Sequence, residues 1–378
     1  MKSISQMRNL LLFTWAFFLV VLLDRKQKVK NPKKILIVQL SKLGDMVCTT
    51  PMFRAIKKTF PQTKVLVVGD VINEQVLAGN PDVDTYFACN KKDFFSTVRR
   101  IRKEQPDFVC ITGPDFTSLL MAIFSGARSI SAFKVSGGIT TETRTYTLLQ
   151  RFVHSIPYTF GTYVPRALLC LLEPAGIMSE KTKKYLYFTD NAKKKIDTLF
   201  SPHNILKKDL VVGISPTAGH RTKQWSANQF AKVADYLYKT YQAKIIVIGG
   251  PQDKKEGDAM QNALNDNTEV INTVGELSVD ELKAIISRLD LFISVDTGPI
   301  YIAEAFGVAT IDIAGPIDVN EQPPQGAIHK NVVPKSGKKL LFAMNVRNYD
   351  FDEVRREVES ITPEMVLQAF EELYPLIK

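Results

Sequence analysis

Cysteine and histidine are scarce in this chain, which has four of each among 378 residues and no CxxC pair. A zinc site is therefore not expected, because zinc needs closely spaced nitrogen or sulfur ligands. Four free thiols in a chain of this length also favour a reducing compartment over a disulfide-linked secreted fold.

Two common nucleotide-binding fingerprints are also missing. The chain contains neither a GxGxxG turn nor a GxxxxGK[ST] loop, which weakens the interpretations as a dinucleotide oxidoreductase or a P-loop kinase. No Asp-x-Asp pair lies at the carboxyl end of a predicted strand either. We therefore expect no metal ion and no cofactor.

Acidic residues are outnumbered by basic ones, 39 to 49, giving a formal charge of +10. This excess points to an anionic partner, which could be nucleic acid, a membrane or a phosphorylated substrate. The aromatic and basic array of a nucleic-acid-binding module is not present, so nucleic acid is not expected. With 45% hydrophobic and 23% charged residues, the chain suits two globular domains.

The long apolar run near the N-terminus, residues 10–23, is short for a membrane span. As a helix it would extend roughly 21 Å, against a hydrocarbon core of roughly 30 Å. A basic stretch follows it and a small-residue cleavage site does not, which disfavours a signal peptide. A short spanning helix and an interfacial anchor stay open, and either would hold the protein to anionic lipid on the cytoplasmic face of the inner membrane. Because Pro32 precedes the first predicted strand, we expect residues 1–30 to take no part in folding.

Beyond this segment, short β-branched runs alternate with helical stretches, which predicts parallel sheets covered by helices on both faces. A polar stretch at 178–208 interrupts the alternation and is interpreted as an interdomain linker. We therefore expect an anchor with its basic flank at 1–32, an N-terminal domain at 33–190 and a C-terminal domain at 205–378. The predicted strands are 34–40, 64–69, 84–88, 107–111, 129–133, 210–216, 244–250, 291–295 and 309–315.

Ligands of open α/β sheets bind beyond the carboxyl ends of the strands. Here those positions are the turns at 41–45, 215–223, 249–253 and 296–299, which we expect around one cleft between the domains. Residues 136–165 are rich in Gly, Thr and Arg and could form a mobile loop over that cleft or simply a long connection.

The turn SVDTGP ends a buried strand and opens a helix. Free backbone N–H groups at such a helix start favour a phosphate, although Asp296 could equally be an ordinary N-cap. A carboxylate repels phosphate. We therefore expect Asp296 to accept hydrogen bonds from sugar hydroxyls, while Thr297 and Gly298 contact the phosphate.

Two further turns carry candidate ligand contacts. In PTAGHRTKQW, Lys223 is a point charge suited to a diphosphate, although a lone loop lysine is most often only solvated. In GGPQDKKE, Asp253 could bind ribose hydroxyls or cap a helix.

Four segments, taken together and in this order, resemble glycosyltransferase family 9, the heptosyltransferase type. They are QLSKLGDMVCTTP (39–51), PTAGHRTKQW (216–225), VDTGPIY (295–301) and GVATIDIAGPI (307–317), and the resemblance covers about residues 33–370. It implies a GT-B fold, with two Rossmann-like domains facing an interdomain cleft. It also implies an inverting, metal-independent transfer of a heptose-like sugar from an ADP-heptose-like nucleotide sugar to lipopolysaccharide or a related cell-surface glycolipid acceptor.

The resemblance also assigns roles by position. Asp45, after Gly44 in the LGD turn, matches the catalytic base, and Tyr301 stands where the family usually has His. The donor-side matches are Lys223 for the diphosphate, Asp296, Thr297 and Gly298 for the nucleotide-sugar turn, and Asp253 and Leu277 for ribose and adenine.

The chemistry of inversion favours a base over a helix cap for Asp45. A carboxylate would take the proton of the acceptor hydroxyl as that hydroxyl attacks the anomeric carbon. Lys223 and the backbone N–H groups of Thr297 and Gly298 would stabilise the leaving diphosphate. Two alternatives stay open, a sugar-nucleotide-binding protein with a decayed site and a GT-B-type nucleotide-sugar epimerase.

Overall fold

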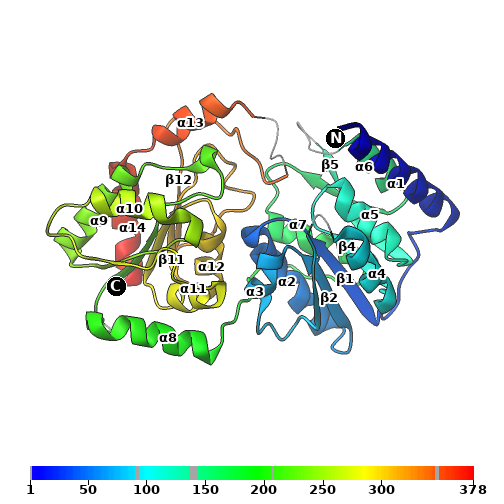
Figure 1. The fold of residues 1–378 in the computed structure, drawn as a ribbon, viewed down its shortest axis with the longest axis horizontal. Coiled ribbons are helices and arrows are strands. Elements are labelled where there is room, and N and C mark those ends of the chain that lie inside the picture. The colour runs from blue at the N-terminus through cyan, green and yellow to red at the C-terminus, as the bar shows by residue number, and fades with distance from the viewer. Residues whose placement is uncertain (1, 91–92, 137–142, 207, 345–348) are drawn as a thin grey trace. The chain divides into compact units, whose positions relative to one another are not determined.

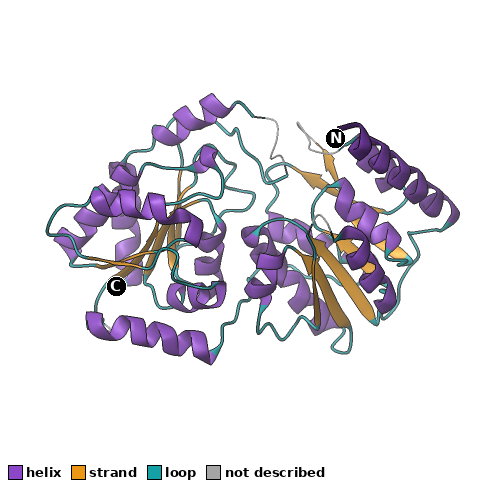
Figure 2. Cartoon of the chain, viewed as in Figure 1, coloured by secondary structure: helices purple, strands orange, loops and turns teal. Residues whose placement is uncertain are grey.

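The computed structural model describes residues 2–90, 93–136, 143–206, 208–344 and 349–378, with side chains from residue 9 onward (Figure 1). The chain forms two compact α/β units, the first running to Lys183 and the second comprising most of the chain from Lys184. Figure 2 shows each sheet in orange between purple helices.

The first unit is built on six parallel strands in the order β3-β2-β1-β4-β5-β6. The β-branched residues of the interior strands at 34–39 and 64–69 are buried on both faces, as a covered parallel sheet requires. The strands are β1 (Lys34–Gln39), β2 (Lys64–Gly69), β3 (Thr85–Ala88), β4 (Phe108–Ile111), β5 (Ser129–Ser136) and β6 (His154–Thr159). The helices are α1 (Lys2–Leu22), α2 (Leu43–Thr59), α3 (Val71–Leu77), α4 (Phe94–Glu104), α5 (Phe116–Phe124), α6 (Arg144–Gln150) and α7 (Val164–Cys170), followed by η1 (Glu173–Ala175).

The second unit repeats this topology in the order β12-β11-β10-β7-β8-β9. In both sheets the first and fourth strands are central neighbours, which is the Rossmann arrangement. The strands are β7 (Val211–Ser215), β8 (Lys244–Val247), β9 (Val270–Asn272), β10 (Leu291–Val295), β11 (Ala309–Ile313) and β12 (His329–Val332). The helices are α8 (Asp190–Phe200), η2 (Ser201–His203), η3 (Arg221–Lys223), α9 (Ala227–Tyr241), η4 (Pro251–Asp253), α10 (Lys254–Asn262), α11 (Val279–Ile286), α12 (Gly298–Phe306), α13 (Phe351–Glu359) and α14 (Pro363–Ile377).

Three strands lie outside the predicted set, namely β6, β9 and β12. The region 136–165, expected to be either a mobile loop or a long connection, contains α6 and β6, and its residues 137–142 lie outside the described part of the chain. The polar stretch expected to be a linker contains α8, whose N-cap Thr189 donates its hydroxyl to Asp280 of the second unit at 2.7 Å.

Helix α1 does not behave as a detached anchor. It lies on α5 and α6 and buries Ala16 and Val20 in the core of the first unit. The side chain of Arg25, just after the helix, is buried and donates to the carbonyl oxygens of Ala127 and Ile123. The expectation that residues 1–30 take no part in folding is therefore wrong, because they complete the packing of this unit.

Within the described residues, no helix combines the length and the apolar character needed to cross a bilayer. The expectation of a short spanning anchor is not supported.

Candidate functional site

The candidate donor site lies at the carboxyl edge of the second sheet. Strands β7 and β10 are neighbours there, with Ser215 opposite Ser294. The chain leaves β7 towards β8 on one side and leaves β10 towards β11 on the other. This reversal is the switch point at which Rossmann-type sheets bind their ligands.

Lys223, Asp296 and Tyr301 meet at this switch point. The ammonium group of Lys223 forms an ion pair with Asp296 Oδ2, and the Tyr301 hydroxyl donates to Asp296 Oδ1 at 2.5 Å. Tyr301 is buried, whereas the Lys223 side chain is 30% exposed. Both oxygens of Asp296 are thus engaged, yet each retains acceptor capacity for a ligand hydroxyl.

Asp296 is not the N-cap of the following helix. That position belongs to Thr297, and α12 begins at Gly298. Pro299, the next residue, has no N–H to donate. The N–H groups expected to contact a phosphate are therefore those of Thr297 and Gly298.

A second acidic residue, Asp312, lies beneath this cluster on β11, in register with Ser294 of β10. It is fully buried, and neither carboxyl oxygen has a hydrogen-bond partner among the described residues. Burial raises the pKa of Asp312 well above its usual value, and the Asp296 charge raises it further, although Lys223 opposes this. The neutral acid is favoured as a result. Asp312 is not among the residues predicted from the sequence, although an acidic residue inside the apolar strand ATIDI is a signal that could have identified it.

The loop that carries Lys223 is closed by the side chain of Gln224. Its Oε1 accepts from the N–H of Ala218 at 2.9 Å, and its Nε2 donates to the carbonyl of Pro216 at 2.6 Å. Arg355 of α13 then donates to the carbonyl oxygens of Arg221, at 3.2 Å, and of Gln224. The position of Lys223 therefore depends on a distant helix.

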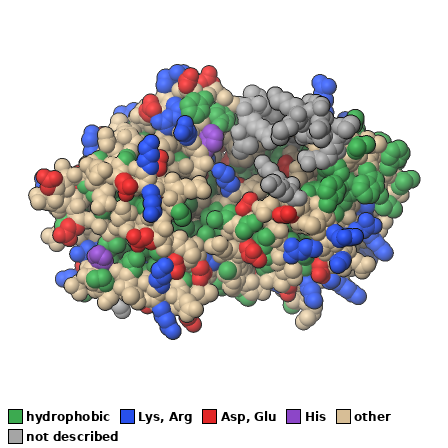
Figure 3. All heavy atoms as spheres, in the orientation of Figure 1, with side chains coloured by type: hydrophobic (Ala, Val, Ile, Leu, Met, Phe, Trp, Pro, Cys, Tyr) green, Lys and Arg blue, Asp and Glu red, His purple; other side chains and the backbone are tan. Residues whose placement is uncertain are grey.

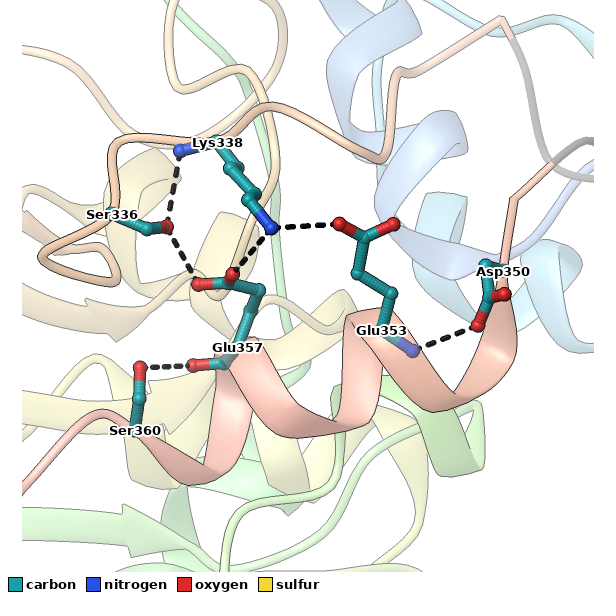
Figure 4. Close-up of polar contacts among 6 residues, drawn as sticks. All are labelled: Ser336, Lys338, Asp350, Glu353, Glu357 and Ser360. Carbon is teal, nitrogen blue, oxygen red and sulfur yellow. Dashed lines mark hydrogen bonds and ion pairs between the residues drawn. The ribbon is translucent and has the colours of Figure 1, made fainter.

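Polar contacts with the 336–338 loop orient helix α13 (Figure 4). The ammonium group of Lys338 lies 2.8 Å from Glu353 and 3.4 Å from Glu357, and the Ser336 hydroxyl donates to Glu357 at 2.6 Å. Asp350 caps the helix by accepting from the N–H of Glu353 at 2.8 Å. Hydrogen bonds to Glu353 and Glu357 raise the pKa of Lys338. Because the Lys338 side chain is half-exposed, these ion pairs are expected to orient the helix more than to stabilise it.

The remaining donor-side candidates follow the neighbouring strands at the same edge. Asp253, after β8, accepts from the N–H of Gly250 at 2.7 Å. Leu277, after β9, is half-buried and precedes Ser278, the N-cap of α11. The structure thus brings Lys223, Asp296 and Tyr301 into contact and places Asp253, Leu277, Thr297 and Gly298 at the same sheet edge.

On the first unit, Asp45 also lies at a switch point, in the first turn of α2 just beyond the end of β1, which neighbours β4 in the sheet. The N-cap of α2 is Lys42, so Asp45 is the third helical residue and not a cap. Its backbone carbonyl accepts from the Thr49 hydroxyl at 2.8 Å, and buried Gly44 precedes it. An acid in this first turn is favoured by the helix dipole. The N-cap interpretation of Asp45 is therefore wrong.

Other kinds of site find less support. Across the described residues, no group of three or more His, Cys, Asp or Glu side chains is placed to hold a metal ion. A hollow of about 720 Å³ lies at the opposite edge of the second sheet, near Lys244 and Val270 where β8 and β9 begin. It is lined by none of the candidate residues.

Comparison with known proteins bears on this arrangement. The family model described as glycosyltransferase family 9 (heptosyltransferase) matches residues 95–345. Lipopolysaccharide heptosyltransferase 3 of Escherichia coli K12 is 27% identical over 291 residues, covering 73% of this chain and 80% of that protein.

Two solved structures share the fold. A glycosyl transferase family 9 protein from Veillonella parvula superposes with a TM-score of 0.74 at 20% identity, covering 91% of this chain and 98% of that one. The E. coli ADP-heptose lipopolysaccharide heptosyltransferase II superposes with a TM-score of 0.69 at 17% identity, covering 91% and 99%.

Proposed function

This chain belongs to glycosyltransferase family 9 and is a glycosyltransferase, and from that premise we propose that it moves a heptose-like sugar from a nucleotide sugar to a lipopolysaccharide-type glycolipid. The contact of Lys223 and Tyr301 with Asp296 at the switch point carries the proposal. It combines a cation for a diphosphate with acceptors for sugar hydroxyls.

The proposed reaction inverts the anomeric centre. The acceptor oxygen forms a bond to the anomeric carbon as the bond from that carbon to the diphosphate oxygen breaks. Asp45 takes the proton of the acceptor hydroxyl, and the bonding electrons leave with the nucleoside diphosphate. Lys223 and the N–H groups of Thr297 and Gly298 stabilise the charge of the leaving group without a metal ion.

We propose an ADP-linked heptose as the donor. Support comes from the proteins with the same fold, one of which is an ADP-heptose lipopolysaccharide heptosyltransferase. In this chain the turns after β8 and β9 place Asp253 and Leu277 at the edge that carries Lys223, in keeping with contacts to ribose and adenine. We further propose that the reaction takes place at the cytoplasmic face of the inner membrane, where a lipid-borne acceptor would meet the nucleotide sugar.

Binding and turnover measurements test this proposal. The melting temperature should rise with ADP-heptose and with ADP, and rise less with UDP- or GDP-sugars, because only a ligand that binds the folded state stabilises it. Transfer to a detergent-solubilised lipopolysaccharide core should continue in EDTA. A strict need for a divalent cation would overturn the metal-independent part, and a preference for another nucleotide would overturn the donor.

A further inference from the structure

Helix α1 has two apolar faces, of which only one is covered. Ala16 and Val20 point into the core of the first unit. The opposite side carries an outer stripe of Leu11, Trp15, Phe18 and Leu22, which are 66%, 56%, 58% and 76% exposed. Their spacing of four, three and four residues places them on one side of the helix. A helix on a water-facing surface would normally carry polar residues there.

Aromatic packing connects the outer stripe to a further exposed apolar residue on α4. Trp15 contacts Phe124 of α5 with ring centroids 5.0 Å apart, and Phe124 contacts Phe94 of α4 at 6.5 Å. Phe95, packed on Phe94, is itself more than half exposed. Figure 3 shows the resulting hydrophobic area in green at the right-hand end, over α1. Contiguous apolar area of this kind marks an interaction surface.

Basic residues border one end of this surface. Lys26, Lys28 and Lys30 are exposed in the segment that follows α1, where Asp24 is the one acid between residues 9 and 33. Burial lowers the pKa of Arg25, and the nearby charge of Arg102 on α4 lowers it further. An apolar face beside such a basic rim is complementary to acyl chains beneath anionic headgroups.

The outer stripe is held rigidly on the first unit. The side chain of Arg25 is hydrogen-bonded within this unit, and its backbone carbonyl accepts from the N–H of Ile130 at 3.0 Å. Lys26 also forms an antiparallel β-bridge with Ser129. The helix therefore presents its apolar face as part of the folded domain and not as a flexible tail.

We propose that the outer stripe inserts into the interfacial layer of an anionic bilayer, with α1 lying along the membrane surface and the basic rim on the headgroups. This refines the membrane location of the proposed function by naming the docking face. A second copy of the chain fits this face less well. The matching face of a second copy would bring another predominantly basic rim, whereas an anionic bilayer complements the charge of Lys26, Lys28 and Lys30.

Trp15 provides a direct test. The only other tryptophan, Trp225, is buried, so lipid contact reports through Trp15. With the full chain and no substrate, vesicles containing phosphatidylglycerol should shift the emission to the blue and carry the protein on flotation. Pure phosphatidylcholine vesicles should do so far less. Absence of binding to the anionic vesicles would overturn the proposal.

Variants separate the apolar and charge contributions. The triple variant Leu11→Gln, Phe18→Gln, Leu22→Gln should lose vesicle binding. A matched triple, Met178→Gln, Leu206→Gln, Leu376→Gln, replaces apolar residues elsewhere that are also more than half exposed, and it should keep vesicle binding. Each of Lys26→Gln, Lys28→Gln and Lys30→Gln should lower the partition coefficient roughly five-fold, equivalent to about 1 kcal/mol.

Two outcomes contradict the proposal. Unchanged binding of the first triple variant would show that another face meets the lipid. A wild-type dimer that dissociates in this variant, measured by sedimentation equilibrium, would make the outer stripe an interface between copies. Because neither donor nor acceptor is used, failure here leaves the proposed transfer reaction intact, and failure of transfer leaves vesicle binding intact.

Discussion

At the scale of single residues, Lys223 is the charged group to which donor affinity should respond most. Lys223→Gln should weaken ADP binding by about 1.5–3 kcal/mol, the range for a hydrogen bond to a charged group. Calorimetry measures this, with Lys239→Gln on the exposed end of α9 as a charge-matched control. Equal ADP affinity in Lys223→Gln and wild type would mean that Lys223 only forms the ion pair with Asp296 and does not bind the donor.

Asp45 makes a different prediction, because we assign it to proton transfer and not to donor binding. Asp45→Asn keeps the shape of the side chain but removes the basic carboxylate, so transfer should fall to background. The rise in melting temperature with ADP should be preserved. Turnover near the wild-type rate would show that Asp45 only contacts a ligand or supports α2.

Asp312 predicts a pH dependence of stability. Its folded-state pKa is raised, so the stabilisation of its neutral form is complete below the unfolded pKa and is lost as pH rises towards the folded pKa. Asparagine does not titrate. Between the unfolded and the folded pKa, the free energy of unfolding of Asp312→Asn should therefore rise relative to wild type by up to about 1.4 kcal/mol per pH unit. Denaturant midpoints from about pH 4 to 8 measure the slope. Parallel profiles for the two proteins would mean that Asp312 is ionised in the fold.

At the scale of elements, the sequence predicted the interior strands and the edge strand β3, and it missed the other three edge strands. β6, β9 and β12 each end a sheet, and their residues are mostly half-buried or exposed. Because an edge strand needs no continuous apolar run, hydrophobicity alone does not reveal it. The spacing of Ser278 and Glu281 predicts a capping box at the start of α11, and the structure confirms it. The same spacing of Ser226 and Gln229 predicts a box at the start of α9, and this prediction is wrong, since Gln229 donates instead to the Ile361 carbonyl at 3.1 Å.

Helix α13 should control the donor site through Arg355, which we assign as a positioning residue. Arg355→Ala removes both bonds to the loop of Lys223, so amide exchange at residues 218–225 should accelerate and ADP affinity should fall by less than in Lys223→Gln. Arg356→Ala, at an exposed neighbouring position, is the control. Unchanged exchange in Arg355→Ala would show that Gln224 alone holds the loop.

For the molecule as a whole, local motifs predict the residues of each turn but not the distant residues that support them. Lys223 and Asp296 could be predicted as site residues from the sequence, because each lies in a turn that follows an apolar strand. Their supports could not, since Arg355 lies 134 residues from Arg221 and Asp312 reaches the site only through the pairing of β10 with β11. The role of α1 was misjudged for a related reason. Its composition shows that it is apolar, but only packing shows that one apolar side faces the core.

Because one side of α1 packs in the core of the first unit, removing the helix should affect the stability of that unit. A protein starting at Asn31 loses Ala16, Val20 and Arg25 from the first unit, and burial of one valine is worth roughly 1.5–3 kcal/mol. We therefore expect the unfolding transition of the first unit to move to lower temperature by calorimetry, while that of the second unit stays. The Leu11→Gln, Phe18→Gln, Leu22→Gln variant, altered only on the exposed side, should keep both transitions. A truncated protein with unchanged melting would mean that α1 contributes nothing to the core, whereas a destabilised triple variant would mean that its exposed side is also packed.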